Sequence, residues 1–303
     1  MPGFLDPEVI AEIDGLSFPP RSTLLGAPTG AQTVAAKKGA SREFSDYRVF
    51  TEGDDPRFID WKAYARKDRY YLRTFEGETS STLWTLLDAS KSMTFTSGRV
   101  SKWELACKMA LGLTYLALKR RDPCGTMLAG DGPLDMVAAK PGWQTLNACT
   151  ALLDGFKDFS SLSDFSGSFE RLAAAMPRPS LVMVFSDFLG VTAEEAFAGL
   201  KALSVRRHEV VAIRILDAAE VDIGLLSPTS ERIRVTDVEG KAAEPIDCDL
   251  SQIAADYRLR LTREQEVFSA LCMHHRIESF TFTTATAAGA ALKQLAAWRL
   301  GCR

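Results

Sequence analysis

The segment D-A-S-K-S at residues 88–92 places one carboxylate and two hydroxyls at alternate positions, directly after the apolar run T-L-W-T-L-L. Carboxylate and hydroxyl oxygens are the ligands that Mg²⁺ prefers, and an ion with few protein ligands keeps several waters. Because serine hydroxyls are neutral, an ion that they hold keeps much of its positive charge and attracts a carboxylate from outside the chain. The segment therefore predicts that Asp88, Ser90 and Ser92 bind Mg²⁺ or another divalent cation.

Other uses of an acid at this position predict different neighbours. A phosphotransfer site of the haloacid-dehalogenase kind needs a second acid two residues after the nucleophilic Asp, and Ser90 stands there. A two-metal site needs several carboxylates around cations about 4 Å apart. A turn that caps the following helix needs one such residue rather than three. We favour a single-ion site, with helix capping and a motif that holds no metal as the open alternatives.

A second apolar run that stops on an acid is L-V-M-V-F-S-D, residues 181–187. Ligands of open α/β sheets bind beyond the carboxyl ends of the strands. We therefore expect Asp88 and Asp187 to meet at one edge of a sheet, where Asp187 acts on the ion directly or through water. We also expect Asp88 to be a surface acid whose removal abolishes Mg²⁺ binding without unfolding the domain.

Apolar runs that alternate with helical patterns must position these side chains. Strands are predicted at 82–88, 124–129, 180–186, 208–216 and 277–283, and helices at 101–120, 143–155, 164–175, 192–204, 249–273 and 286–300. This alternation predicts an α/β fold with a mostly parallel sheet flanked by helices. The segment 230–244 has polar alternation around a Gly and predicts an exposed hairpin.

The chain before residue 81 has a different character. A short helix at 6–14 is followed by several Pro and Gly residues, which indicate a linker. Strand-like runs at 44–50 and 69–76 flank G-D-D-P-R-F-I-D-W and predict a small β-rich subdomain. The predicted division is therefore an N-terminal helix and linker at 1–40, the subdomain at 41–80, and the α/β domain at 81–303.

Composition excludes several classes of protein. The 303 residues are 46% hydrophobic and 25% charged, as in a globular protein, and the net charge of −3 does not favour nucleic acid as a partner. No stretch approaches the roughly 20 apolar residues of a membrane span. The six cysteines show no metal-ligand spacing. We expect a cytoplasmic protein with reduced thiols that has no integral membrane segment.

The D-A-S-K-S segment resembles the D-x-S-x-S motif of the von Willebrand factor A fold, which is Rossmann-like. The metal-ion-dependent adhesion site of that fold adds a Thr from a second loop and an Asp from a third. The resemblance implies that Asp187 is the third element. It implies that Ser163, the expected N-cap of the 164–175 helix, replaces the Thr with another hydroxyl.

A second resemblance covers nearly the whole chain. The stretch G-A-S-R-E-F-S-D-Y-R-V-F-T-E-G-D-D-P-R-F-I-D-W-K-A-Y-A-R, followed by D-x-S-x-S, is similar to the bacterial "domain of unknown function 58" family, with Phe50 where that pattern usually has Tyr. Such proteins are often encoded beside MoxR-type AAA+ ATPases. The resemblance implies an adaptor or chaperone that acts with such an ATPase on other protein complexes.

Two classes of function follow. The first is a non-enzymatic adaptor that captures a partner's acid through Mg²⁺, the partner being a MoxR-type ATPase or its client. The second is a metal-dependent hydrolase or phosphatase. No His, Cys or second acid is placed by the sequence beside Asp88 as a general acid or base, so we favour the adaptor.

Overall fold

The computed structural model describes residues 3–4, 7–19, 43–50, 59–61, 63–64, 69–76, 82–130, 135–159, 165–176, 179–226, 232–235 and 246–301. The chain forms two compact units. The larger unit contains residues 1–19 and 81–303, and the smaller contains residues 20–80. Each unit has a sheet of its own.

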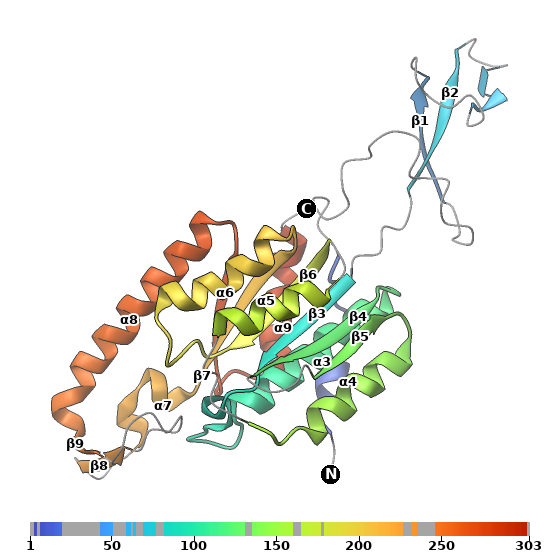
Figure 1. Cartoon of the computed structure of the whole chain (residues 1–303). Coiled ribbons are helices and arrows are strands. Elements are labelled where there is room, and N and C mark those ends of the chain that lie inside the picture. Colours follow the sequence, from blue (N-terminus) through green and yellow to red (C-terminus); the bar gives the residue numbers. More distant parts are fainter. Residues whose placement is uncertain are drawn as a thin grey trace. The chain divides into compact units, whose positions relative to one another are not determined.

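A six-stranded sheet in the order β10-β7-β6-β3-β4-β5 is the centre of the larger unit (Figure 1). The strands are β3 (Thr82–Asp88), β4 (Cys124–Ala129), β5 (Met136–Lys140), β6 (Ser180–Ser186), β7 (Glu209–Leu216) and β10 (Glu278–Thr283). All neighbours are parallel except β4 and β5. This is the doubly wound order, in which the chain reverses direction across the sheet at its first strand, β3. The predicted α/β fold, a mostly parallel sheet flanked by helices, is confirmed.

Helices cover both faces of this sheet (Figure 1). One layer contains α3 (Lys102–Lys119), α4 (Trp143–Gly155) and α9 (Ala288–Gly301), and the other contains α5 (Phe165–Ala175), α6 (Ala193–Val205) and α8 (Leu250–His274). Short elements η3 (Lys91–Thr94), α7 (Ala218–Val221) and η4 (Ile223–Leu226) lie in the connections. The six long helices lie close to their predicted ranges.

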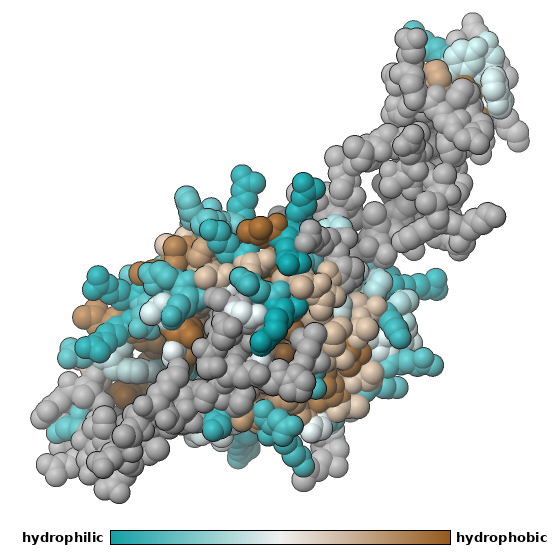
Figure 2. Space-filling view, viewed as in Figure 1, coloured by the Kyte–Doolittle hydropathy of each residue, from teal (hydrophilic) through white to brown (hydrophobic). Residues whose placement is uncertain are grey.

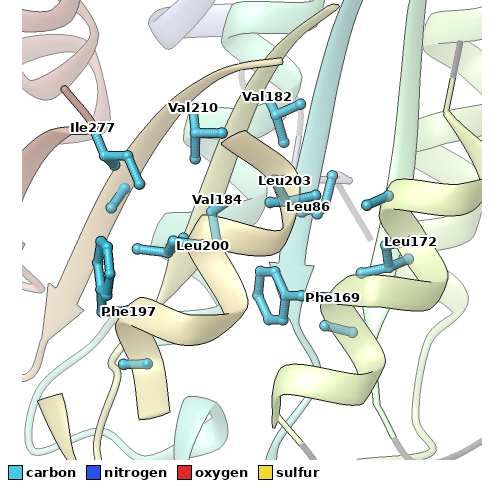
Figure 3. Packing of buried hydrophobic residues seen from close by; sticks show 14 of the residues in the cluster. Leu86, Phe169, Leu172, Val182, Val184, Phe197, Leu200, Leu203, Val210 and Ile277 are labelled. Atoms are coloured by element: carbon cyan, nitrogen blue, oxygen red, sulfur yellow. The ribbon is translucent and has the colours of Figure 1, made fainter. Parts of the chain in front are cut away.

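The core between the sheet and the layer of α5, α6 and α8 is apolar (Figure 3). Leu86 of β3 and Val184 of β6 lie opposite Phe169 of α5 and Leu200 of α6. Because strand side chains alternate between faces, Leu87 points to the other layer. Both faces are covered, so β3 is mostly apolar within the sheet. Its central polar side chain, Thr85, is buried with its hydroxyl 2.9 Å from that of Thr126, and the charged Asp88 comes at the end of the strand.

Gly125 in β4 leaves space for the indole ring of Trp84 on the neighbouring strand β3. A Cβ at this position would lie 2.4–2.8 Å from three ring atoms of Trp84, which is almost wholly buried. We expect Gly125→Ala to lower the free energy of unfolding by about 1–3 kcal/mol, because the rigid ring must shift within a packed core. Urea unfolding measures this effect. Gly155→Ala is the matched control, since its Cβ meets nothing within 4 Å; equal stability of the two variants would contradict the prediction.

The N-terminal helix α1 (Pro7–Ile13) is part of the larger unit, although the sequence grouped it with a linker. It packs against α3 and α9, and Ile13 is fully buried. Arg299 of α9 secures the following segment, because its Nε donates to the Pro19 carbonyl at 2.6 Å while its guanidinium pairs with Glu209.

The smaller unit contains an antiparallel pair, β1 (Glu43–Val49) and β2 (Tyr71–Glu76), as the strand-like runs predict. Asp60 of the I-D-W box is buried, and its carboxylate accepts from the Ala63 amide at 3.2 Å. Trp61 is 62% exposed. The G-D-D-P-R-F part of the motif, residues 53–58, lies outside the described residues.

The predicted hairpin in the larger unit is present as β8 (Arg232–Val235) paired antiparallel with β9 (Ile246–Asp249). Its second strand lies beyond the predicted range of 230–244. The two strands form a separate sheet rather than an edge of the central one.

The surface seen in Figure 2 mixes hydrophilic side chains with smaller hydrophobic patches. Exposed apolar side chains such as Val205, Leu259 and Met273 are spread over α6 and α8. Single exposed apolar residues are ordinary on protein surfaces. Among the described residues, no helix combines the length and the apolar character that crossing a membrane requires.

Candidate metal centre

Strand pairing brings the two predicted acids to the same edge of the sheet. β3 and β6 are parallel neighbours, with Leu87 opposite Phe185, so both chains leave the sheet together at their carboxyl ends. Asp88 ends β3, and Asp187 directly follows β6. The side chains are close enough for the charge of Asp187 to raise the pKa of Asp88.

Asp88 is held by two hydrogen bonds. The backbone amide of Ser90 donates to Oδ1 at 2.8 Å, and the hydroxyl of Ser186 donates to Oδ2 at 2.5 Å. The hydroxyl oxygens of Ser90 and Ser92 lie 2.9 Å apart. Ser90 is buried and Ser92 is half-buried, so the pair of hydroxyls stands between the buried carboxylate and the surface.

The structure does not support helix capping as the role of the three residues. Ser101 caps α3, because its hydroxyl accepts from the Glu104 amide at 3.1 Å. Ser90 occupies the N-cap position of η3 but makes no side-chain capping bond there. Its hydroxyl is paired with that of Ser92 instead.

The expectation that Asp88 is a surface acid is wrong, since its exposed fraction is only 4%. Burial deprives the carboxylate of water and raises its pKa to about 6, and the charge of Asp187 adds to this effect. The hydrogen bonds from Ser186 and Ser90 act in the opposite direction without cancelling it. Among the described residues, no positive charge offsets this rise in the pKa of Asp88.

Asp187 has a different environment. Its Oδ2 lies 2.6 Å from Nζ of Lys102, and its Oδ1 accepts from the Leu189 amide at 2.9 Å. The same ammonium lies 2.6 Å from Oε1 of Glu220. Lys102 is fully buried, so this ion pair is shielded from water and salt.

The turn after β6 is strained in a way that fixes Asp187. Phe188 has a φ of 50°, an unusual value for a residue with a large side chain, and Gly190 has a φ of 77°. Phe188 is nevertheless buried against Phe268 of α8, with ring centroids 4.9 Å apart. Tertiary packing holds this backbone, as is often observed at functional sites.

A third strand also ends on an acid. Asp217 follows β7 and accepts hydrogen bonds from the Ser97 and Ala219 amides and from the hydroxyls of Ser97 and Thr284. Glu220 completes a capping box with Asp217, because its Oε2 accepts from the Asp217 amide at 2.7 Å. Asp217 thereby connects the loops that follow β3, β7 and β10.

Sequence reasoning identified Asp88, Ser90, Ser92 and Asp187, and the structure gathers these residues at one edge. Ser163, the predicted second-loop hydroxyl, lies outside the described residues. Ser186, Lys102 and Glu220 were missed. The D-A-A-E pattern at 217–220 could have revealed Glu220 as part of a capping box, whereas nothing local indicates that Lys102 meets Asp187.

The donor set fits a Mg²⁺ ion in part. In the described part of the chain, no three His, Cys, Asp or Glu side chains are grouped as metal ligands, so an ion here depends on serine hydroxyls. Paired hydroxyls beside a carboxylate whose charged form is disfavoured by burial suit a hard divalent cation. Asp187 fits less well, because Lys102 already neutralises it.

The chain is similar to mycobacterial proteins in sequence and to Bacteroides proteins in structure. Uncharacterized protein Rv1480 of Mycobacterium tuberculosis and uncharacterized protein Mb1516 of Mycobacterium bovis are each 25% identical over 220 residues, covering 72% of this chain and 68% of theirs. Among solved structures, an aerotolerance-related membrane protein from Bacteroides fragilis aligns with a TM-score of 0.47 and 12% identity, over 72% of this chain and 100% of that one. The hypothetical protein BatB from Bacteroides thetaiotaomicron aligns with a TM-score of 0.45 and 12% identity, over 73% and 100%.

The family match covers a similar share of the chain. The family described as "Protein of unknown function DUF58" matches residues 46–267, which include most of the smaller unit's strands and the sheet edge with Asp88 and Asp187. This range is well over half of the chain. The chain belongs to the family "Protein of unknown function DUF58".

Proposed function

We propose that this protein is a non-enzymatic interaction module that captures a carboxylate of a protein partner at a divalent-cation site. The observation that carries the proposal is the pair of hydroxyls of Ser90 and Ser92, 2.9 Å apart, beside the buried Asp88. The raised pKa of Asp88 supports the proposal, because a nearby cation would stabilise this carboxylate.

Each side chain has a defined part in this proposal. Ser90 and Ser92 would hold the ion through their hydroxyl oxygens, and Asp88 and Asp187 would act directly or through waters. When bound, Mg²⁺ would supply a strongly electrophilic centre with a position open to an outside anion. Ser186 and the Ser90 amide orient Asp88 for this role, and the turn at Phe188 fixes Asp187.

The alternative is a metal-dependent hydrolase or phosphatase. The raised pKa of Asp88 would suit a general acid or base. However, both of its carboxylate oxygens accept hydrogen bonds from the protein, and the position two residues later is Ser90 rather than a second acid. These features favour capture over catalysis, and Mg²⁺-dependent turnover of an aryl phosphate would favour the hydrolase.

The proposed partner is a MoxR-type AAA+ ATPase or a client that it remodels. The family resemblance of the D-x-S-x-S segment and of the I-D-W box supports this assignment. A partner Glu or Asp would bind at the carboxyl edge of the sheet, where the half-buried Ser92 gives access to the site.

We expect the complex with a MoxR-type ATPase from the same organism to weaken by at least about tenfold in EDTA and in Ser90→Ala. The physical reason is that the hydroxyl supplies a ligand oxygen that alanine lacks. Co-purification with the tagged protein, in Mg²⁺ and in EDTA, measures the effect. His274→Gln, at the exposed end of α8, is the control and should bind normally. A complex that forms equally well in EDTA and with Ser90→Ala would rule out the metal site as the contact.

A further inference from the structure

Lys102 occupies a position that local rules disfavour. It is the first residue of α3, where a positive charge opposes the helix dipole, and its side chain is fully buried. Burying an ammonium group is costly unless it is paired and hydrogen-bonded. Departures from local rules that tertiary contacts must compensate are expected at functional sites.

Two carboxylates compensate for this burial, and one of them faces the candidate metal centre. The ammonium donates to Oδ2 of Asp187 and to Oε1 of Glu220, both at 2.6 Å. Glu220 is itself fixed, because its other oxygen accepts from the Asp217 amide. The ammonium is therefore held at one place, against a carboxylate whose charge also reaches Asp88.

We propose that Lys102 competes with the divalent cation for Asp187. By neutralising this carboxylate, the lysine weakens Mg²⁺ binding. This inference rests on the metal site of the proposed function and concerns how tightly that site binds. An ammonium beside the site repels a second cation and occupies a carboxylate that would otherwise attract it. A weak site of this kind releases its ion readily unless a partner's carboxylate adds to the ligands.

The first test is the Mg²⁺ affinity of Lys102→Met, measured by isothermal titration calorimetry with MgCl₂. Methionine fills similar space without charge, so Asp187 loses its ion pair with the ammonium, and the affinity should rise by at least about tenfold. The buried Arg214, whose Nε donates to the Asp187 carbonyl at 3.0 Å, keeps its charge in this variant. Lys102→Arg keeps the charge and should remain close to the wild type. Lys108→Met is the matched control, because it removes a lysine from the same helix that pairs with Glu104 at the surface.

Lys102→Met leaves Asp187 and Glu220 without their buried partner, which could prevent folding. A second variant covers that case. The double variant Lys102→Met/Glu220→Gln removes one positive and one negative charge and leaves the net charge unchanged. Any rise in its Mg²⁺ affinity comes from freeing Asp187 rather than from the total charge. We expect a rise of about tenfold in this variant as well. Mg²⁺ should also raise its melting temperature more than that of the wild type.

The outcomes separate this inference from the proposed function. Stronger binding in the lysine variants supports the inference, including the case in which only those variants bind Mg²⁺ measurably. Unchanged affinity in the folded lysine variants, beside a wild type that binds Mg²⁺, overturns the inference and leaves the metal site intact. Absence of binding in the wild type and in every lysine variant overturns both.

Discussion

Replacing Asp88 with Asn should abolish most Mg²⁺ binding and yet stabilise the metal-free protein at neutral pH. The first effect follows from the loss of the negative charge beside Ser90 and Ser92, and we expect the affinity to fall about 10- to 100-fold. The second follows from removing a buried charge that the metal-free site does not compensate. Asparagine can keep both contacts, since its oxygen can accept from the Ser90 amide and its nitrogen can donate to the Ser186 hydroxyl.

The stabilisation by Asp88→Asn should depend on pH. The pKa of Asp88 rises from 3.8 to about 6 on folding, so the native state binds more protons than the unfolded state between these values. Stability in EDTA therefore falls as the pH rises through this window, by about 3 kcal/mol in total. The variant has no such charge, so its advantage should be largest above pH 7 and should shrink toward pH 4.

Urea unfolding in EDTA at several pH values checks the stability, and calorimetry with MgCl₂ checks the binding. Mg²⁺ should stabilise the wild type at neutral pH and have little effect on the variant. A metal-free variant that is less stable than the wild type at pH 7.5 would show that Asp88 already has sufficient positive charge around it. Unchanged Mg²⁺ affinity would remove Asp88 from the site.

The arrangement of the sheet could be predicted from the sequence because its strands are short apolar runs between helical patterns. The expected position of Asp88 and Asp187 at one edge of the sheet depends on β3 and β6 being parallel neighbours, which the strand pattern alone does not specify. β5 was missed because M-V-A-A-K is short and only half-buried, so it lacks the continuous apolar signal of a central strand. Its position at the edge of the sheet explains that composition.

The electrostatics of the site could not be predicted in the same way. Whether an acid at a strand end is exposed depends on the loops that cover it, and Asp88 is buried where a surface position was predicted. The pairing of Lys102 with Asp187 spans 85 residues and depends on how α3 crosses the end of β6. Local patterns carry no information about such contacts, except for the capping box that fixes Glu220.

Asp217 provides the opposite case to Asp88, and Asp217→Asn should destabilise the protein at neutral pH. Burial alone would raise the pKa of Asp217, but hydrogen bonds from Ser97, Ala219 and Thr284 outweigh burial and lower it. The charged form is therefore favoured in the folded state. An ionised carboxylate that accepts several hydrogen bonds stabilises the loops that supply them.

Asparagine cannot replace this carboxylate in either orientation. Oδ1 of Asp217 accepts from the Ala219 amide, and Oδ2 accepts from the Ser97 amide at 3.2 Å. Whichever oxygen becomes the amide nitrogen, one backbone N–H loses its acceptor and faces another donor. We expect a loss of about 1–3 kcal/mol in the free energy of unfolding.

The pH dependence of Asp217→Asn should also be opposite in sign. Because the folded pKa of Asp217 is lowered, its contribution is present above the unfolded value of 3.8 and is lost as the pH falls through the folded pKa. The difference between wild type and variant should therefore be full at pH 7 and shrink only in acid, below about pH 4. Urea unfolding in EDTA, over the same pH series as for Asp88→Asn, measures it. If both variants shifted stability in the same direction at pH 7, the contrast between an uncompensated acid and a hydrogen-bonded acid at this edge of the sheet would be wrong.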